Sequence, residues 1–472
     1  MQPINRLPPE TFSSIGRKVT GNSLDASASL FPLTHVCQRW RESLISIPEN
    51  WSSISNWNDD IAAVCLQRAK AAPLEISLYK PSPPEPSLFP HIIEPYDQNI
   101  RTLNVGLDSA SAVEQVTATF PSFPQSMPML ESLELESGGE EEDWSIDPFE
   151  PGFTLALKCL SLTSIPLYPS ILRIRTLTEL ILCDPVGDLR FDTLLDFLEN
   201  NNSLESVHLD IEFVEPPPRN LQRRITKNQL QYLSIWCKND VEARALIITI
   251  PLRRGASLDI NIQDQNATLI DTIPNVSTAH LLDPQSPSTF ELITHRRCRV
   301  GVLLRGLGGE FSFFKPVRVE DSEPFPDLHQ LPLTNIHEFR LLHFEEAERN
   351  VPEPPVFRPS LFPNLETLAI ECNPECETDV RRVLSSLLSN PTSSSLLKTL
   401  AFLNCTLSEE LVEEITNFAS ERKRTLTSTW LYRVLIVHQD GKFPSAASIH
   451  KLKNYVKVVE VRMGNELPEG LT

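Results

Sequence analysis

The chain has 472 residues, 40% of them hydrophobic, so it is long enough to bury more than one substantial core. Its 42 Lys and Arg residues against 62 Asp and Glu residues give a formal net charge of −20 at pH 7. A charge of this sign repels phosphate backbones and anionic lipid head groups, so the composition argues against nucleic acids and membrane surfaces as partners.

The cysteines and the first residues bear on the location of the protein. The nine cysteines follow no regular framework, an odd count that indicates reduced thiols. The opening stretch, MQPINRLPPE, lacks the basic start and apolar run of a signal peptide, and no apolar stretch approaches the roughly 18 residues of a membrane span. We therefore expect the protein in the cytoplasm, the nucleus or both.

Two helical segments are predicted near the N-terminus. The prolines of Leu7-Pro8-Pro9-Glu10 suit a first helical turn, so a helix is expected to follow them up to about residue 20. Apolar residues then recur at helical spacing and predict one helix across residues 30–44 with a single apolar side. The residues on that side are Leu30, Leu33, Val36, Cys37, Trp40 and Leu44. About 50 residues bury too little surface for secure stability, so this region needs either the following segments or a partner protein to cover it.

From residue 57 the pattern changes to a helix, a strand at 74–79 and then a series of short strand-like cores. The early cores are IRTLNVGL, MLESLELE, LKCLSLTS, LTELILCD, LESVHLDI and LQYLSIWC. Aligned on the fourth residue of each L-x-x-L-x-L pattern, they lie at 103, 133, 160, 180, 207 and 233, with intervals of 30, 27, 20, 27 and 26 residues. These intervals bracket the period of leucine-rich repeats.

Two later cores fit the repeat template most fully. Residues 365–373 match L-x-x-L-x-L-x-x-N with Asn373 in the last place, and residues 397–405 match it with Cys405 there. Helices are predicted between the cores, with Asp192, Asp379 and Ser408 as their N-caps. Between about 255 and 335 the repeats degenerate, with LDINIQ and VGVLL the only obvious strands, so the number of repeat coils there stays open.

The sequence therefore predicts an α/β fold with two domains. Residues 1–56 form a small all-helical domain. Residues 57–472 form an irregular, curved repeat solenoid, with a parallel sheet on its concave face and helices on its convex face. Acidic and proline-rich loop insertions interrupt the repeats, the acidic one around Glu140-Glu141-Glu142-Asp143.

The N-terminal segment resembles the F-box, in the form found at the start of many proteins of mushroom-type fungi. The resemblance rests on Leu7-Pro8-Pro9-Glu10, Val36-Cys37, Arg39-Trp40-Arg41, Pro48-Glu49 and Trp51, and the rest of the chain resembles F-box proteins with leucine-rich repeats. It implies docking on a Skp-type adaptor, and through it on a cullin-RING ubiquitin ligase, while the repeats capture a protein substrate. The adaptor-binding residues that it implies are Leu7, Pro8, Pro9, Phe12, Ile15, Val36, Cys37, Trp40 and Leu44.

The function expected from this resemblance is that of a non-catalytic substrate receptor. Thr11 and Gly16 stand where the family usually has apolar residues, which leaves open a protein-interaction scaffold acting outside a ligase. An enzyme on a repeat scaffold is a third, weaker reading, because no hydrolase signature appears, and no cofactor or metal site is expected. The expected substrate face is the concave side of the strands. The residues expected to be exposed there are Glu131, Glu134, Thr178, Glu205, His208 and Ser234.

Overall fold

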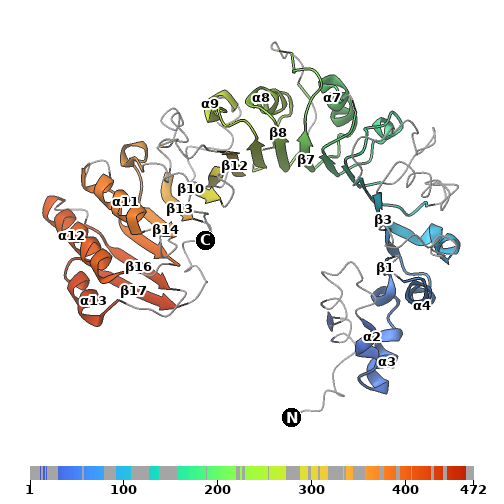
Figure 1. The fold of residues 1–472 in the computed structure, drawn as a ribbon, viewed down its shortest axis with the longest axis horizontal. Helices are drawn as coiled ribbons and strands as arrows, with labels where there is room; N and C mark the ends of the chain where they lie inside the picture. The colour runs from blue at the N-terminus through green and yellow to red at the C-terminus, as the bar shows by residue number, and fades with distance from the viewer. Residues whose placement is uncertain are drawn as a thin grey trace. The chain divides into compact units, whose positions relative to one another are not determined.

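A computed structural model gives the chain a mixed α/β fold with a large, mostly parallel sheet and accompanying helices (Figure 1). It describes residues 11, 14–15, 18, 30–55, 58–78, 92–107, 127–137, 157–187, 189–218, 224–225, 229–253, 255–272, 288–295, 299–306, 309–316, 333, 336–343, 357–371, 377–389, 394–404, 407–426, 430–438 and 444–463. The chain divides into two compact units. Unit 1 comprises Met1–Pro216 and Ile225–Gln229, and unit 2 comprises Pro217–Arg224 and Leu230–Thr472.

The N-terminal part of unit 1 is helical, but the single helix predicted across residues 30–44 is wrong. Two helices occupy this stretch, α2 (Phe31–Thr34) and α3 (Gln38–Ile45), and the 3₁₀ helix η3 (Pro48–Trp51) follows. Cys37 adopts an extended backbone, with φ −161°, and serves as the N-cap residue of α3. The apolar spacing continues through this break, so periodicity alone could not locate it.

The strands of unit 1 lie in chain order, and each is parallel to the next. They are β1 (Ser53–Ser55), β2 (Leu74–Leu78), β3 (Ile100–Leu107), β4 (Ser132–Ser137), β5 (Cys159–Thr163), β6 (Glu179–Cys183) and β7 (Ser206–Ile211). The connections carry α4 (Asp59–Ala69), η4 (Glu94–Asn99), η5 (Ile171–Arg173) and α7 (Phe191–Asn200). Parallel neighbours require such crossover connections, which explains the alternation of strands with helical turns.

The register of these strands matches the repeat alignment made from the sequence. Leu103, Leu133, Leu160, Leu180 and Val207 stand directly beside one another from β3 to β7. All five side chains are buried. The predicted intervals are therefore the chain lengths between laterally paired strands, and the regular apolar positions form the core on one face of the sheet.

A backbone feature that the sequence did not predict marks the end of several strands. Ser164, Asp184 and Asn404 have φ values of 54°, 47° and 56°, in the left-handed region that few residues other than glycine adopt. Each follows the aligned apolar residue of its strand by four positions. The Ser164 amide donates to the Cys183 carbonyl at 2.8 Å, so this conformation pairs the turn with the next strand.

Unit 2 contains the remaining described strands and most of the longer helices. Its strands are β8 (Tyr232–Cys237), β9 (Ser257–Ile262), β10 (Ser288–His295), β11 (Arg299–Gly306), β12 (Gly309–Pro316), β13 (Ile336–His343), β14 (Thr367–Glu371), β15 (Thr399–Leu403), β16 (Arg433–His438) and β17 (Val458–Met463). Its helices are α8 (Asp240–Thr249), α9 (Leu269–Thr272), η8 (Pro359–Leu361), α11 (Glu377–Ser389), α12 (Glu409–Thr425) and α13 (Ala446–Lys453). Helices α11, α12 and α13 pack against one another in sequence.

The strand order of unit 2 departs from chain order between β9 and β13. Strand β12 is parallel to β9, β11 is antiparallel to both β12 and β10, and β10 is parallel to β13. From β13 onward each strand again pairs in parallel with the next. The two strands that were obvious from the sequence between 255 and 335 are present as parts of β9 and β11, and β10 and β12 lie there besides them.

The residues at which the helices begin can be compared with the three predicted N-cap residues. Ser408 is confirmed, because its side chain accepts a hydrogen bond from the Leu411 amide at 3.2 Å at the start of α12. Asp192 and Asp379 are not N-caps, since α7 begins at Phe191 and α11 at Glu377. Asn373 and Cys405 lie outside the described residues.

Candidate functional site

The helical segment before β1 packs on the first helix after it. The Trp51 indole donates from Nε1 to the Leu44 carbonyl at 2.9 Å, and its ring meets the Phe31 ring edge-on with centroids 5.5 Å apart. The Arg68 guanidinium of α4 lies over the Trp51 ring, 4.2 Å from its centroid. Leu30, Leu44 and Trp51 are fully buried in this cluster, so much of the apolar surface of the segment is covered by the chain itself.

The residues predicted to bind an adaptor separate into different environments. Val36, in the break between α2 and α3, is 55% exposed, and Cys37 beside it is half-buried. Trp40 and Leu44 on α3 are buried, and Ile15 is half-buried. Leu7, Pro8, Pro9 and Phe12 lie outside the described residues. Among the predicted adaptor-binding residues that the structure describes, Val36 is therefore the exposed one.

The face of the unit 1 strands opposite the apolar core is polar and acidic. Alternate residues of each strand point to this face, as the pleat requires. Its carboxylates are Glu75, Glu134, Glu136, Glu179 and Asp210. Arg101 on β3 and His208 on β7 are the basic residues of these strands. Carboxylates therefore outnumber basic side chains on the exposed positions of β2 to β7.

Glu131 lies just before β4 and is held between two cations. Lys158 donates to its Oε1 at 2.9 Å, and Arg101 donates to its Oε2, also at 2.9 Å. These hydrogen bonds, the one from Lys158 first, lower the pKa of the Glu131 carboxyl. The three side chains line a hollow of about 390 Å³ at the amino ends of the first strands. Glu131 was predicted as a substrate contact, and its charge is already paired within the chain.

The other predicted substrate contacts of unit 1 lie on or beside neighbouring strands. Glu134 is exposed on β4, and partial burial, reinforced by the charge of Glu136, raises its pKa. Thr178 donates to the Lys158 carbonyl at 3.2 Å, Glu205 is exposed, and His208 is half-buried on β7. The strands present Glu134 and His208 on the polar face, whereas Thr178 and Glu205 precede β6 and β7.

In unit 2 the corresponding face is mostly buried and opens over β8, β9 and β12. One row of laterally paired residues crosses this face from β12 to β16. All of these side chains are buried: Ser312, Leu303, Glu291, Arg340, Ala369, Ala401 and Leu435. By contrast, Tyr232 and Trp236 on β8 are exposed, and Asp259 on β9 is half-exposed. The open part of this face therefore coincides with the place where strand order departs from chain order.

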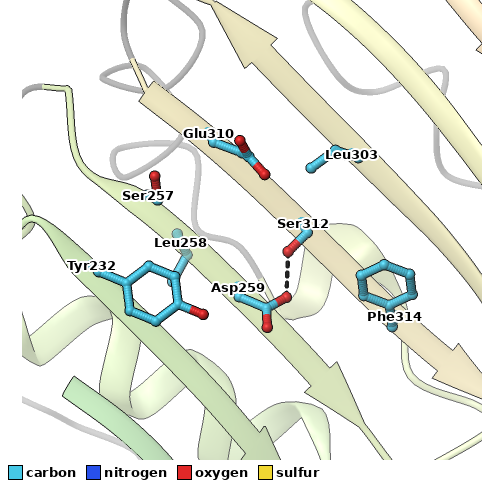
Figure 2. A pocket seen from close by; sticks show the side chains of 8 residues that line it. All are labelled: Tyr232, Ser257, Leu258, Asp259, Leu303, Glu310, Ser312 and Phe314. Atoms are coloured by element: carbon cyan, nitrogen blue, oxygen red, sulfur yellow. Dashed lines mark hydrogen bonds between the residues drawn. The ribbon is translucent and has the colours of Figure 1, made fainter. Parts of the chain in front are cut away.

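A pocket of about 240 Å³ lies in this open part (Figure 2). Tyr232, Ser257 and Glu310 form one row across β8, β9 and β12. Because Ser257 is small, a hollow remains between the two larger side chains. Leu258, Asp259, Leu303, Ser312 and Phe314 complete the lining.

Asp259 is the polar centre of the pocket. Ser234 donates to its Oδ2 at 3.2 Å, and Ser312 donates to its Oδ1, as the dashed line in Figure 2 marks. Burial raises the pKa of the Tyr232 hydroxyl, and the negative charges of Asp259 and Glu310 raise it further. The pocket is thus an electronegative hollow with an aromatic side wall.

One residue at this site, Ser234, was predicted from the sequence to be a substrate contact, and the other residues of the site were not predicted. Ser234 was predicted as an exposed substrate contact, but it is buried beneath the site, where it fixes the Asp259 carboxylate. Tyr232 and Asp259 carried no motif. Glu310 and Ser312 lie on β12, a strand that the sequence did not predict. The alternation in YLSIWC and SLDINI did give the signal that Tyr232 and Asp259 share a face.

Among the described residues, no group of three or more His, Cys, Asp or Glu side chains is placed to hold a metal ion. None of the helices in the described ranges is long and apolar enough to cross a membrane. Burial raises the pKa of the thiols of Cys159, Cys183 and Cys237, so these cysteines are poor nucleophiles.

Comparison with known proteins adds no relative to these observations. No protein-family model matches the chain, and no curated protein matches it.

Proposed function

We propose that the chain is the substrate-recognition subunit of an SCF-type ubiquitin ligase. In this proposal residues 1–56 are an F-box that docks on a Skp-type adaptor, and the following strands form a leucine-rich-repeat solenoid that captures a protein substrate. The subunit performs no chemistry. It raises the local concentration of substrate lysines near a ubiquitin-charged conjugating enzyme.

The observation that carries the proposal is the arrangement of the repeated strands behind the helical segment. Laterally paired apolar residues at the predicted positions leave a mostly polar face on β2 to β7, which suits recognition of a protein partner. In the helical segment, Val36 is exposed in the break between α2 and α3.

The first test is recovery of a co-expressed Skp-type adaptor with the full-length chain. We expect the adaptor to co-purify, and we expect Val36→Asp to reduce its recovery by at least about tenfold, because a carboxylate cannot be buried in an apolar interface without a large cost. Val214→Asp is the matched control, since Val214 is 58% exposed at a distance in sequence from the helical segment. Failure to recover the adaptor with the full-length chain, under conditions where a known F-box protein captures it, would contradict the proposal.

A second candidate function is an interaction scaffold outside a ligase. The burial of Trp40 and Leu44 within the chain favours it, because these two residues are then unavailable to an adaptor without rearrangement. The scaffold predicts partners that bind equally well without residues 1–55 and whose abundance does not respond to cullin inhibition. Turnover of a bound partner that stops when residues 1–55 are deleted would exclude the scaffold and support the ligase.

A further inference from the structure

The size and lining of the pocket between β8, β9 and β12 indicate which kind of substrate side chain it can bind. It lies beside the buried row that Ser312 begins on this face of unit 2, and its volume of about 240 Å³ suits the end of one side chain. Ligand sites for drug-sized molecules are larger, from roughly 300 Å³ upward. The pocket is therefore matched to a single residue of a partner protein.

The charge of the pocket selects a cation. Among the lining residues whose side chains the structure describes there is no Lys, Arg or His, whereas Asp259 lies at the centre of the pocket (Figure 2). Glu310 from β12 is a second carboxylate in the lining. Lys315, the lysine of β12, is buried, and its Nζ donates to the Ala267 carbonyl at 2.8 Å.

The hydrogen bonds of Asp259 leave it able to accept more. One serine hydroxyl donates to each of its oxygens, from Ser234 and from Ser312. An ionised carboxylate offers about four acceptor positions, so two remain for a ligand. The two serines hold the carboxylate in place before any ligand arrives, which reduces the ordering that binding requires.

The aromatic wall distinguishes between the two basic side chains. Tyr232 is 39% exposed beside the hollow, and Phe314 lines it from β12. A planar guanidinium can stack on an aromatic ring while its fork of N–H groups donates to a carboxylate, which a compact ammonium cannot do.

We propose that this pocket binds an arginine side chain of the protein substrate, with the guanidinium donating to Asp259 and stacking on Tyr232. The inference rests on the proposed function, in which this face captures a protein. It adds a requirement for an arginine in the recognised segment.

The test is a titration of the full-length chain with N-acetyl-arginine amide, followed by saturation-transfer-difference NMR. N-acetyl-citrulline amide, which has nearly the same shape without the charge, is the ligand control. We expect the citrulline compound, and the arginine compound with the Asp259→Asn variant, each to bind at least about tenfold more weakly, since each loses hydrogen bonds between charged groups. Tyr232→Leu should weaken arginine binding about fivefold.

A matched variant controls for the overall negative charge of the chain. Glu410→Gln removes one exposed carboxylate on α12 of the same unit and should leave binding unchanged. Equal binding of the citrulline compound, an equal effect of Glu410→Gln and Asp259→Asn, or no binding of the arginine compound would each overturn the proposal. If Asp259→Asn does not fold, the comparison of the arginine and citrulline compounds and the Tyr232→Leu variant still test the proposal. Tyr232 is exposed, so its replacement should leave the fold intact.

This outcome is independent of the adaptor experiment. Arginine binding without adaptor recovery would retain the pocket and remove the ligase. Adaptor recovery without arginine binding would do the reverse.

Discussion

Arg422 on α12 provides the most specific test of how unit 2 is held together. It is 1% exposed, and its guanidinium donates to the Ser394 hydroxyl at 3.0 Å, the Ser394 carbonyl at 2.9 Å and the Leu397 carbonyl at 3.1 Å. The chain turns into β15 at this point, so one side chain ties a helix to the start of a strand. Replacement of Arg422 by methionine keeps an unbranched apolar stem and removes all three hydrogen bonds.

The expected loss follows from two opposing effects. A hydrogen bond from a charged donor contributes about 1.5–3 kcal/mol. Against this, burial lowers the pKa of Arg422 from 12.5 to about 10, which corresponds to a cost of about 3 kcal/mol for the charged form. The hydrogen bonds outweigh this cost, and the buried Leu397 carbonyl would lose its donor. We therefore expect Arg422→Met to lower the local free energy of unfolding by about 2–4 kcal/mol.

Hydrogen exchange of residues 399–403, the β15 segment, is the suitable measurement, because it reports local opening in a chain of two units. Arg424→Met is the matched control. The Arg424 side chain is 74% exposed and pairs with Glu421 on the same helix, so its loss should leave hydrogen exchange at β15 close to that of the wild type.

The pH dependence is a second check on this reasoning. The lowered pKa of Arg422 means that the folded and unfolded states differ in protonation only above about pH 10. The effect of Arg422→Met should therefore be constant between about pH 6 and pH 8. Exchange at β15 that is as slow in Arg422→Met as in the wild type would refute the role of these hydrogen bonds.

Two further predictions concern the surfaces. Val36→Asp should leave the urea midpoint of the chain within experimental error of the wild type, because Val36 is exposed in the folded state; a large drop would mean that its side chain is part of the core. Partial burial and the charge of Glu136 raise the pKa of Glu134, so its charged form is disfavoured in the folded state above that pKa. Glu134→Gln should accordingly melt at a higher temperature than the wild type at pH 7, and the difference should vanish as the pH falls below about 4.5, where the carboxyl is protonated in both states. A difference that persists at low pH would assign the effect to packing.

The repeated strands could be predicted from the sequence because each follows the same rule. The first, fourth and sixth residues of the L-x-x-L-x-L cores are buried, and all eight predicted cores are confirmed as strands. Strand β16, with the sequence RVLIVH, was not predicted. It is a continuous apolar run, and such a run cannot be distinguished from a buried helical segment by periodicity.

The N-terminal segment shows a different limit of sequence reasoning. Its apolar spacing indicated one helix with a single apolar side. The break at residues 35–37 divides these apolar residues between two helices, so they no longer share one side. Leu44 is buried and Trp51 lies beneath Arg68, whereas Val36 is exposed. The spacing identifies the apolar residues of the segment, but the position of the break determines which of them the chain itself buries.

The pocket could not be predicted because its rows join segments in an order that the chain does not follow. In the regular part of unit 2 each strand lies beside its predecessor, and paired positions such as Ala369 and Ala401 are equivalent residues of successive repeats. Between β9 and β13 the antiparallel strand β11 reverses the direction of the chain, so that β12 returns to lie beside β9. Residues from a segment without the repeat pattern then complete a row begun by β8 and β9. The loss of repeat pattern between residues 255 and 335 and the presence of an unusual site on the strand face therefore have the same cause. Because β12 does not follow the repeat pattern, Glu310 and Ser312 occupy positions at which a regular repeat would have residues equivalent to those of β8 and β9.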